Sequence, residues 1–176
     1  MDEHSIIACI CEGAAEQAIV ELLLENNKLI FEKHYLLDEK VIRCRSARNF
    51  EERYLRMHFN KKIKIYRILD SRNENFKLSK PYKDKVEVEN VITAPEIEML
   101  IIHNENKYED YKKSGKKPSN YCKQNLGFSD VKSYKFVRSY FADVNILINA
   151  IKQHWSKARI LGNEKTLFDL LQNAGN

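Results

Sequence analysis

Acidic residues follow three of the apolar segments in this sequence, and carboxylates at such positions could hold a divalent cation. Mg²⁺ and Mn²⁺ prefer oxygen ligands, and Mg²⁺ keeps several of its waters when it binds a protein. An ion of this kind clamps a phosphodiester, activates a water and neutralises charge on the leaving oxygen. The predicted metal ligands are Glu12, Glu16, Asp70, Glu74 and Glu98.

Each of these acids also has a purely structural interpretation. Glu12 and Glu16 begin a predicted helix, where the helix dipole favours negative charge without any ligand. Glu96 can complete a capping box with Thr93, and Asp70 can begin a turn. A metal site therefore depends on whether the fold brings the acids together.

Short apolar segments predict the strands that would position these acids. The segment 5–11 (SIIACIC) is apolar without alternation, which is typical of a strand buried on both faces of a parallel sheet. Further strands are expected at 41–44, 63–69 and 86–92, and the polar segment 70–85 is expected to be a loop because Pro81 interrupts it. The acids would then lie beyond the carboxyl ends of the strands, where ligands bind in such sheets.

Helical periodicity follows several of these strands. After Gly13, one buried stripe is predicted for a helix, and residues 47–60 predict a second helix. Thr93 and Pro95 indicate the start of a third. The stripe of the first helix consists of Ala15, Ala18, Ile19, Leu22 and Leu23.

The C-terminal third is expected to be helical as well, with a stripe of apolar residues from 144 to 151 and a last short helix near Leu167. We therefore predict one α/β domain, 1–176, with a parallel sheet and helices on both of its faces. It divides into a core (5–103), a basic segment (104–128) and C-terminal helices (129–176).

Composition limits the class of protein. The 176 residues are 43 % hydrophobic and 31 % charged, which excludes collagen-like and fully disordered chains. A net charge of +5 is compatible with a nucleic-acid partner. The four cysteines lack the spacing of a zinc site, so they are expected to be reduced and mostly buried. No apolar run approaches the roughly 18 residues needed to cross a bilayer, and a cytoplasmic location without a membrane partner is expected.

The basic segment alternates lysines with tyrosines. Lysines neutralise phosphates, and tyrosines offer surfaces on which unpaired bases stack. The alternative is a solvated surface loop, which is the usual role of a charged run. The residues predicted to bind nucleic acid are Lys112, Lys113, Lys116, Lys117, Tyr121 and Lys123.

Two stretches of the chain resemble the Toprim domain, the metal-binding catalytic core of topoisomerases, primases and OLD-type nucleases. The first is 11–16 (CEGAAE) after an apolar strand, followed later by a strand that ends in Asp70. The second is 93–103 (TAPEIEMLIIH) before a Lys-rich segment, which resembles RloB-like and other small Toprim proteins of bacterial phage defence. The resemblance covers about residues 5–125 and implies a Toprim-like, Rossmannoid sheet.

The resemblance also implies roles for single residues. Glu12 would be the Toprim glutamate, a metal ligand or general acid/base, and Glu16 the second glutamate of the OLD-type pattern. Asp70 would be the first acid of the Asp-x-Asp motif, but Arg72 stands where the second is expected. Glu74 or Glu98 could supply the missing carboxylate, and Arg72 could hold a phosphate bidentately.

Three functions remain open on these grounds. The first is a Mg²⁺- or Mn²⁺-dependent nuclease that cleaves DNA or an RNA such as tRNA, with Glu12, Asp70 and Arg72 as catalytic residues. By resemblance it would serve phage defence or a toxin-like system, with a partner ATPase or an inhibitor protein, and it could form a homodimer. The second is a non-catalytic Toprim-like module that binds nucleic acid or a partner ATPase. The third is a small-molecule phosphotransfer enzyme; dinucleotide, P-loop and α/β-hydrolase motifs do not occur.

Overall fold

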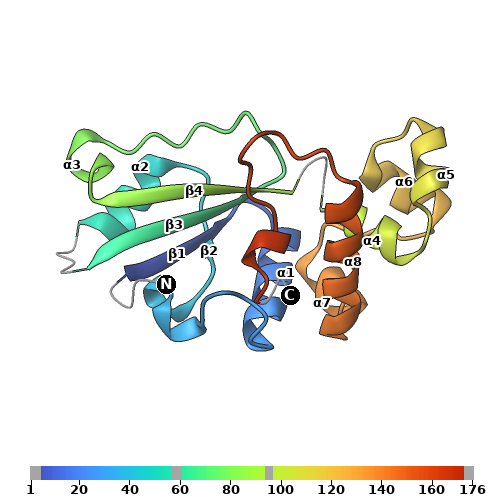
Figure 1. Ribbon diagram of the computed structural model, residues 1–176, viewed down its shortest axis with the longest axis horizontal. Coiled ribbons are helices and arrows are strands. Elements are labelled where there is room, and N and C mark those ends of the chain that lie inside the picture. Colours follow the sequence, from blue (N-terminus) through green and yellow to red (C-terminus); the bar gives the residue numbers. More distant parts are fainter. Residues whose placement is uncertain (1–4, 57–60, 94–96, 173–176) are drawn as a thin grey trace.

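A four-stranded parallel sheet forms the centre of the α/β core (Figure 1). The computed structural model describes residues 5–56, 61–93 and 97–172. The strand order is β2-β1-β3-β4, and every pair is parallel. Cys11 pairs with Ile68, so β1 and β3 end side by side. The strands are β1 (Ser5–Cys11), β2 (Ile42–Arg43), β3 (Lys62–Leu69) and β4 (Val86–Ile92).

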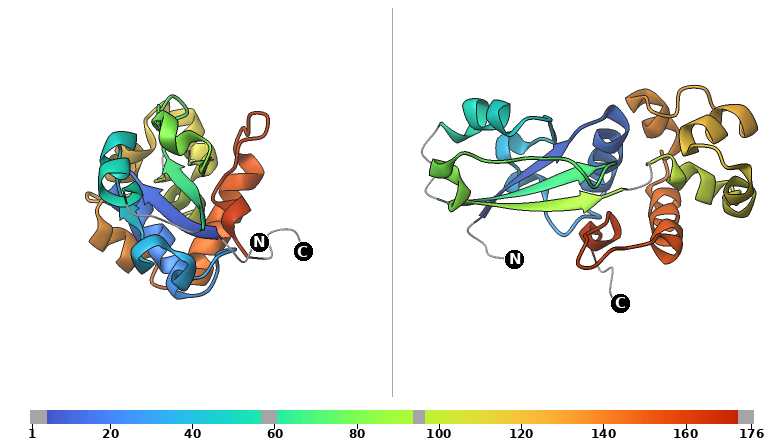
Figure 2. Two further views of the ribbon diagram at one scale, coloured as in Figure 1. Left: turned by 90° about the vertical axis from the view of Figure 1, so that its left-hand side faces the viewer. Right: turned by 90° about the horizontal axis from the view of Figure 1, so that it is seen from above.

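Helices cover both faces of this sheet, as the unbroken apolar run of β1 predicted (Figures 1 and 2). Helix α1 (Ala14–Glu25) packs on the face that carries Cys9 and Cys11. On the opposite face, α2 (Ala47–Phe50) continues into a π-helical turn, η3 (Glu51–Leu55), that packs on Ala8. Because both faces are buried, β1 has no polar side to alternate with.

A helical part lies at the carboxyl end of the strands, and α5 and α6 form its far end (Figure 1). Helix α8 packs on α4, and α7 packs on α1. The stripe predicted for α8 is buried at Val144, Leu147 and Ile151. The helices are α4 (Met99–Asn104), α5 (Tyr108–Ser114), α6 (Pro118–Asn125), α7 (Tyr134–Tyr140) and α8 (Val144–Lys157).

Several local expectations were wrong. The segment 70–85 contains a short helix, α3 (Lys80–Lys83), because Pro81 occupies its first turn, where a missing N–H costs nothing. Thr93 does not cap α4, which begins at Met99; its hydroxyl donates to the Leu69 carbonyl instead. Pro95 and Glu96 lie outside the described residues.

The end of the chain contains less regular structure than its periodicity suggested. The last predicted helix is a single 3₁₀ turn, η4 (Phe168–Leu170). Two further 3₁₀ turns, η1 (Lys33–Tyr35) and η2 (Leu37–Glu39), connect α1 to β2. All four cysteines are free, and all but Cys44 are buried, as expected. Within the described ranges, no helix combines the length and apolar character that a membrane span requires.

Candidate metal site at the carboxyl ends of the strands

A pocket of about 310 Å³ lies beyond the carboxyl ends of β1 and β3. The two strands are neighbours, so the residues that follow them emerge at one edge of the sheet. All five acids predicted as metal ligands line this pocket, together with two cationic side chains. The charged lining residues are Glu12, Glu16, Asp70, Glu74, Glu98, Arg45 and Lys132.

Glu16 reaches the pocket because Gly13 leaves space for it. Gly13 is the N-cap of α1, and the Glu16 carboxylate folds back over it. A Cβ at position 13 would collide with the Glu16 carboxylate oxygen, although the backbone there (φ −110°, ψ 170°) suits any residue. Glycine is therefore required at position 13 so that the Glu16 carboxylate can approach the backbone closely, and not for the backbone conformation itself.

Glu98 enters the pocket from the segment between β4 and α4. Its side chain is only 2 % exposed and forms an ion pair with Lys132 at 3.2 Å between Nζ and Oε1. Lys132 lies between α6 and α7, so the helical part contributes a cation to a site at the end of the sheet. This ion pair is part of the pocket lining.

Glu12 is held by an arginine that lies inside the sheet. The Arg67 guanidinium donates to Glu12 Oε1 at 3.1 Å and to Asn90 Oδ1 at 3.4 Å. It also lies over the Phe76 ring, 4.5 Å from the centroid. Arg67 is 1 % exposed, so Glu12 supplies the negative charge that a buried guanidinium requires.

Burial and mutual repulsion disfavour ionisation of two of the acids. Burial raises the pKa of Glu12, and the charge of Glu74 raises it further; Arg67 opposes both effects. Burial likewise raises the pKa of Glu16, where Asp70 adds like charge and Lys132 opposes it. A cation among these carboxylates would relieve this repulsion.

The donor set fits a magnesium-type ion in its chemistry. Five carboxylates face Arg45, Lys132 and the nearby Arg67, which leaves an excess of negative charge. Among the described residues, no three acidic, histidine or cysteine side chains are already gathered closely enough to hold a metal. Mg²⁺ does not require such a set, because it is commonly bound by one or two carboxylates plus waters.

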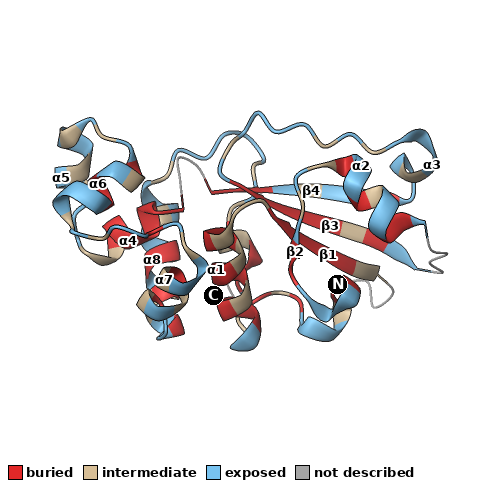
Figure 3. Cartoon of the chain, turned by 180° about the vertical axis from the view of Figure 1, so that it is seen from behind, coloured by how far each residue is buried: buried red, intermediate tan, exposed pale blue. Residues whose placement is uncertain are grey.

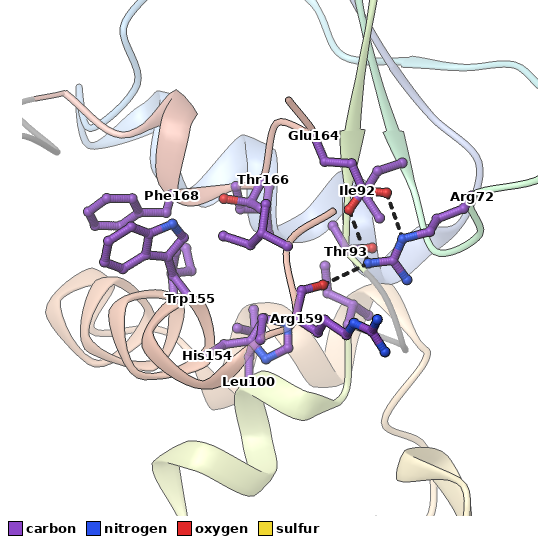
Figure 4. Close-up of a pocket in the computed structure, with 15 residues that line it drawn as sticks. Arg72, Ile92, Thr93, Leu100, His154, Trp155, Arg159, Glu164, Thr166 and Phe168 are labelled. Atoms are coloured by element: carbon purple, nitrogen blue, oxygen red, sulfur yellow. Dashed lines mark hydrogen bonds and ion pairs between the residues drawn. The ribbon is translucent and has the colours of Figure 1, made fainter. Parts of the chain in front are cut away.

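Arg72, which was predicted to be catalytic, does not line this pocket. Its Nε and Nη2 donate to the two carboxylate oxygens of Glu164 at 2.6 and 3.1 Å, and Nη2 also donates to the Arg159 carbonyl at 3.1 Å (Figure 4). Glu164 and Arg159 belong to the segment after α8. The guanidinium thus joins the β3–β4 connection to the C-terminal segment.

The predicted nucleic-acid-binding residues lie on α5, on α6 and in the turn between them, at the far end of the helical part (Figures 1 and 3). Tyr121 is 3 % exposed and packs edge-on against Tyr111, so its ring offers no surface for a base; this prediction was wrong. Lys112, Lys113, Lys117 and Lys123 are exposed, and Lys116 is half-buried and donates to Asn125. None of the six lines the acidic pocket.

Sequence reasoning missed the three cations of the site. Arg67 had a visible signal, because it is a charge in the C-terminal half of the apolar run IKIYRIL of β3, three residues after Lys64. A charge at such a position indicates a buried partner. Arg45 and Lys132 had no comparable signal, since each stands in a polar segment and reaches the pocket only through the fold.

Comparisons of the chain with models of protein families, with curated proteins and with solved structures gave no significant match. The assignment of the site therefore depends on its geometry and charge.

Glu16→Gln should make stability less sensitive to pH. Folding raises the pKa of the Glu16 carboxyl above its value in the unfolded chain, near 4.5. Such a group stabilises the folded state fully at a pH below the unfolded pKa. This stabilisation is lost as the pH rises through the pKa of the folded state. In metal-free buffer the variant should match the wild type near pH 4 and gain relative stability by pH 7. Urea denaturation at both pH values measures this, and a constant difference would contradict it.

Gly13→Ala should move the Glu16 carboxylate out of the pocket. The added methyl occupies the position of that carboxylate, and a more exposed group titrates closer to its ordinary pKa. We expect an NMR titration to show a lower Glu16 pKa, with the free energy of unfolding changed by less than about 1 kcal/mol. An unchanged Glu16 pKa would show that the carboxylate does not occupy this space.

Proposed function

We propose that this protein is a divalent-metal-dependent phosphodiesterase that cleaves nucleic acid. The observation that carries the proposal is the gathering of five acids, from the segments that follow three parallel strands, around one pocket of about 310 Å³. Mg²⁺ or Mn²⁺ would be held by carboxylates of this set, with Asp70 and Glu74 at its exposed side. When bound, the ion would supply an activated water and charge neutralisation at the leaving oxygen.

The chain's own groups have distinct roles in this proposal. Lys132 and Arg45 line the same pocket and would attract the phosphate of the substrate. Glu12 has a raised pKa, which suits a group that accepts a proton from the attacking water near neutral pH. Arg67 would position Glu12 for this transfer, because it is buried and donates to one carboxylate oxygen.

The resemblance to Toprim proteins supports a nuclease and extends the proposal to its setting. We propose an effector of phage defence or of a toxin-like system that acts in the cytoplasm on DNA or an RNA such as tRNA. A nuclease of this kind needs restraint, which a partner ATPase, an inhibitor protein or a homodimer would supply.

Two ion pairs favour a second function, a non-catalytic module that binds nucleic acid or a partner ATPase. Glu12 is engaged by Arg67, and Arg72 stands in place of the second acid and pairs with Glu164. In this function the cations of the acidic pocket would take the place of the metal ion, and the site would have no catalytic activity.

Metal titration separates the two functions. The nuclease predicts that millimolar Mg²⁺ or Mn²⁺ raises the melting temperature and enables cleavage of plasmid, single-stranded DNA or total tRNA. The module predicts neither effect. K⁺ at equal ionic strength controls for screening, and the absence of both effects with both metals would overturn the nuclease.

A further inference from the structure

A second pocket, of about 290 Å³, lies between α5 and the end of α8. Four cationic side chains line it, and no carboxylate is among its lining residues in the described part of the chain. Tyrosine rings form part of its wall. The residues that matter here are Arg72, Lys112, Lys157, Arg159, Tyr108 and Tyr111.

The fold brings the cations of this basic pocket together with few carboxylates nearby to neutralise their charge. The Lys157 and Lys112 Nζ atoms both lie over the Tyr108 ring, at 4.7 and 5.5 Å from its centroid. Lys112 Nζ forms a long ion pair with Glu109, at 3.9 Å from Oε2. Glu164 neutralises the charge of Arg72. Three further cations thus face one cavity, an arrangement that attracts an anion.

Residues that are neighbours in the sequence line the basic pocket and the acidic pocket. Asp70 lines the acidic pocket, and Arg72, two residues later, lines the basic one. Likewise Glu98 faces the first and its neighbour Met99 the second. The connection after β3 and the segment at the start of α4 therefore contribute residues to both pockets.

We propose that the basic pocket binds a phosphate group of a single nucleic-acid strand whose neighbouring segment enters the acidic pocket. The inference rests on the proposed function. Lys112, Lys157 and Arg159 are all exposed, and Lys113 and Lys117 continue the positive charge onto α5 and the α5–α6 turn. Such a track suits an extended backbone. The sequence lacks the glycine-rich loops that hold the phosphates of free nucleotides.

The test compares two double variants with the same loss of charge. Lys157→Ala/Arg159→Ala removes two cations of the basic pocket, whereas Lys135→Ala/Lys152→Ala removes two exposed lysines of α7 and α8 that do not line it. Binding of a fluorescent single-stranded oligonucleotide is measured in EDTA, so that cleavage cannot interfere. We expect the pocket variant to bind at least about five-fold more weakly. The slope of log affinity against log salt concentration should fall by roughly 0.7, the contribution of one neutralised phosphate on a single strand.

Each outcome decides the proposal. Weaker binding by the pocket variant alone, with AMP failing to compete, supports it. Equal binding by both variants overturns it, as does efficient competition by AMP, which would indicate a mononucleotide site. A wild type that binds no strand also overturns it, and the cleavage assay then decides the proposed function separately. Equal melting temperatures confirm that both variants fold.

Discussion

Asp70→Asn should lower metal-dependent cleavage by about 100-fold or more while the fold stays intact. Asp70 is exposed at the end of β3, so its carboxylate has no packing role to lose. It is, however, one of the charges that raise the pKa of Glu12 and Glu16. The substitution keeps the shape of the side chain and removes an oxygen ligand with its charge. Initial rates of cleavage at saturating Mn²⁺ measure the effect.

Asp84→Asn is the matched control for this substitution. Asp84 is an exposed aspartate in the same β3–β4 connection, and it does not line the acidic pocket. Its replacement should leave cleavage unchanged. In Asp70→Asn the pKa of Glu16 should also fall, which NMR detects without any metal. Cleavage at the wild-type rate by Asp70→Asn would contradict the assignment of Asp70 as a metal ligand.

Glu12→Gln should destabilise the protein by about 3 kcal/mol as well as reduce cleavage. The Arg67 guanidinium would keep its charge in a position that is 1 % exposed, without the carboxylate that compensates it. A neutral amide at position 12 can still accept a hydrogen bond, but it cannot supply the charge. Urea denaturation at pH 7 measures the change in the free energy of unfolding.

The double variant Glu12→Gln/Arg67→Met separates this effect from a general loss of packing. It removes both charges and keeps an apolar chain of similar length in the sheet, so much of the lost stability should return. Glu32→Gln is the control, because Glu32 is an exposed glutamate that does not line the acidic pocket. A double variant less stable than Glu12→Gln would show that the unpaired charge of Arg67 does not cause the loss of stability.

Local sequence patterns were sufficient for the sheet and for the acids at its edge. The uninterrupted apolar run of β1 predicted burial on both faces, and α1 and α2 cover those faces. Parallel strands end at a common edge, so the carboxylates that follow β1, β3 and β4 meet in one pocket. The periodicity of α1 and α8 likewise predicted their buried stripes, because a helix presents positions three and four apart on one face.

What the sequence by itself determined, then, is the α/β class, the strand ends and the acids beside them, since each follows from spacing within one element. Only the tertiary structure decided which charges are paired. Arg72 and Glu164 are 92 residues apart and Arg67 and Glu12 are 55 apart, and such distant contacts leave no mark in a local pattern. The burial of Tyr121 and the approach of Lys132 to Glu98 likewise depend on how the helices pack, which no single helix encodes.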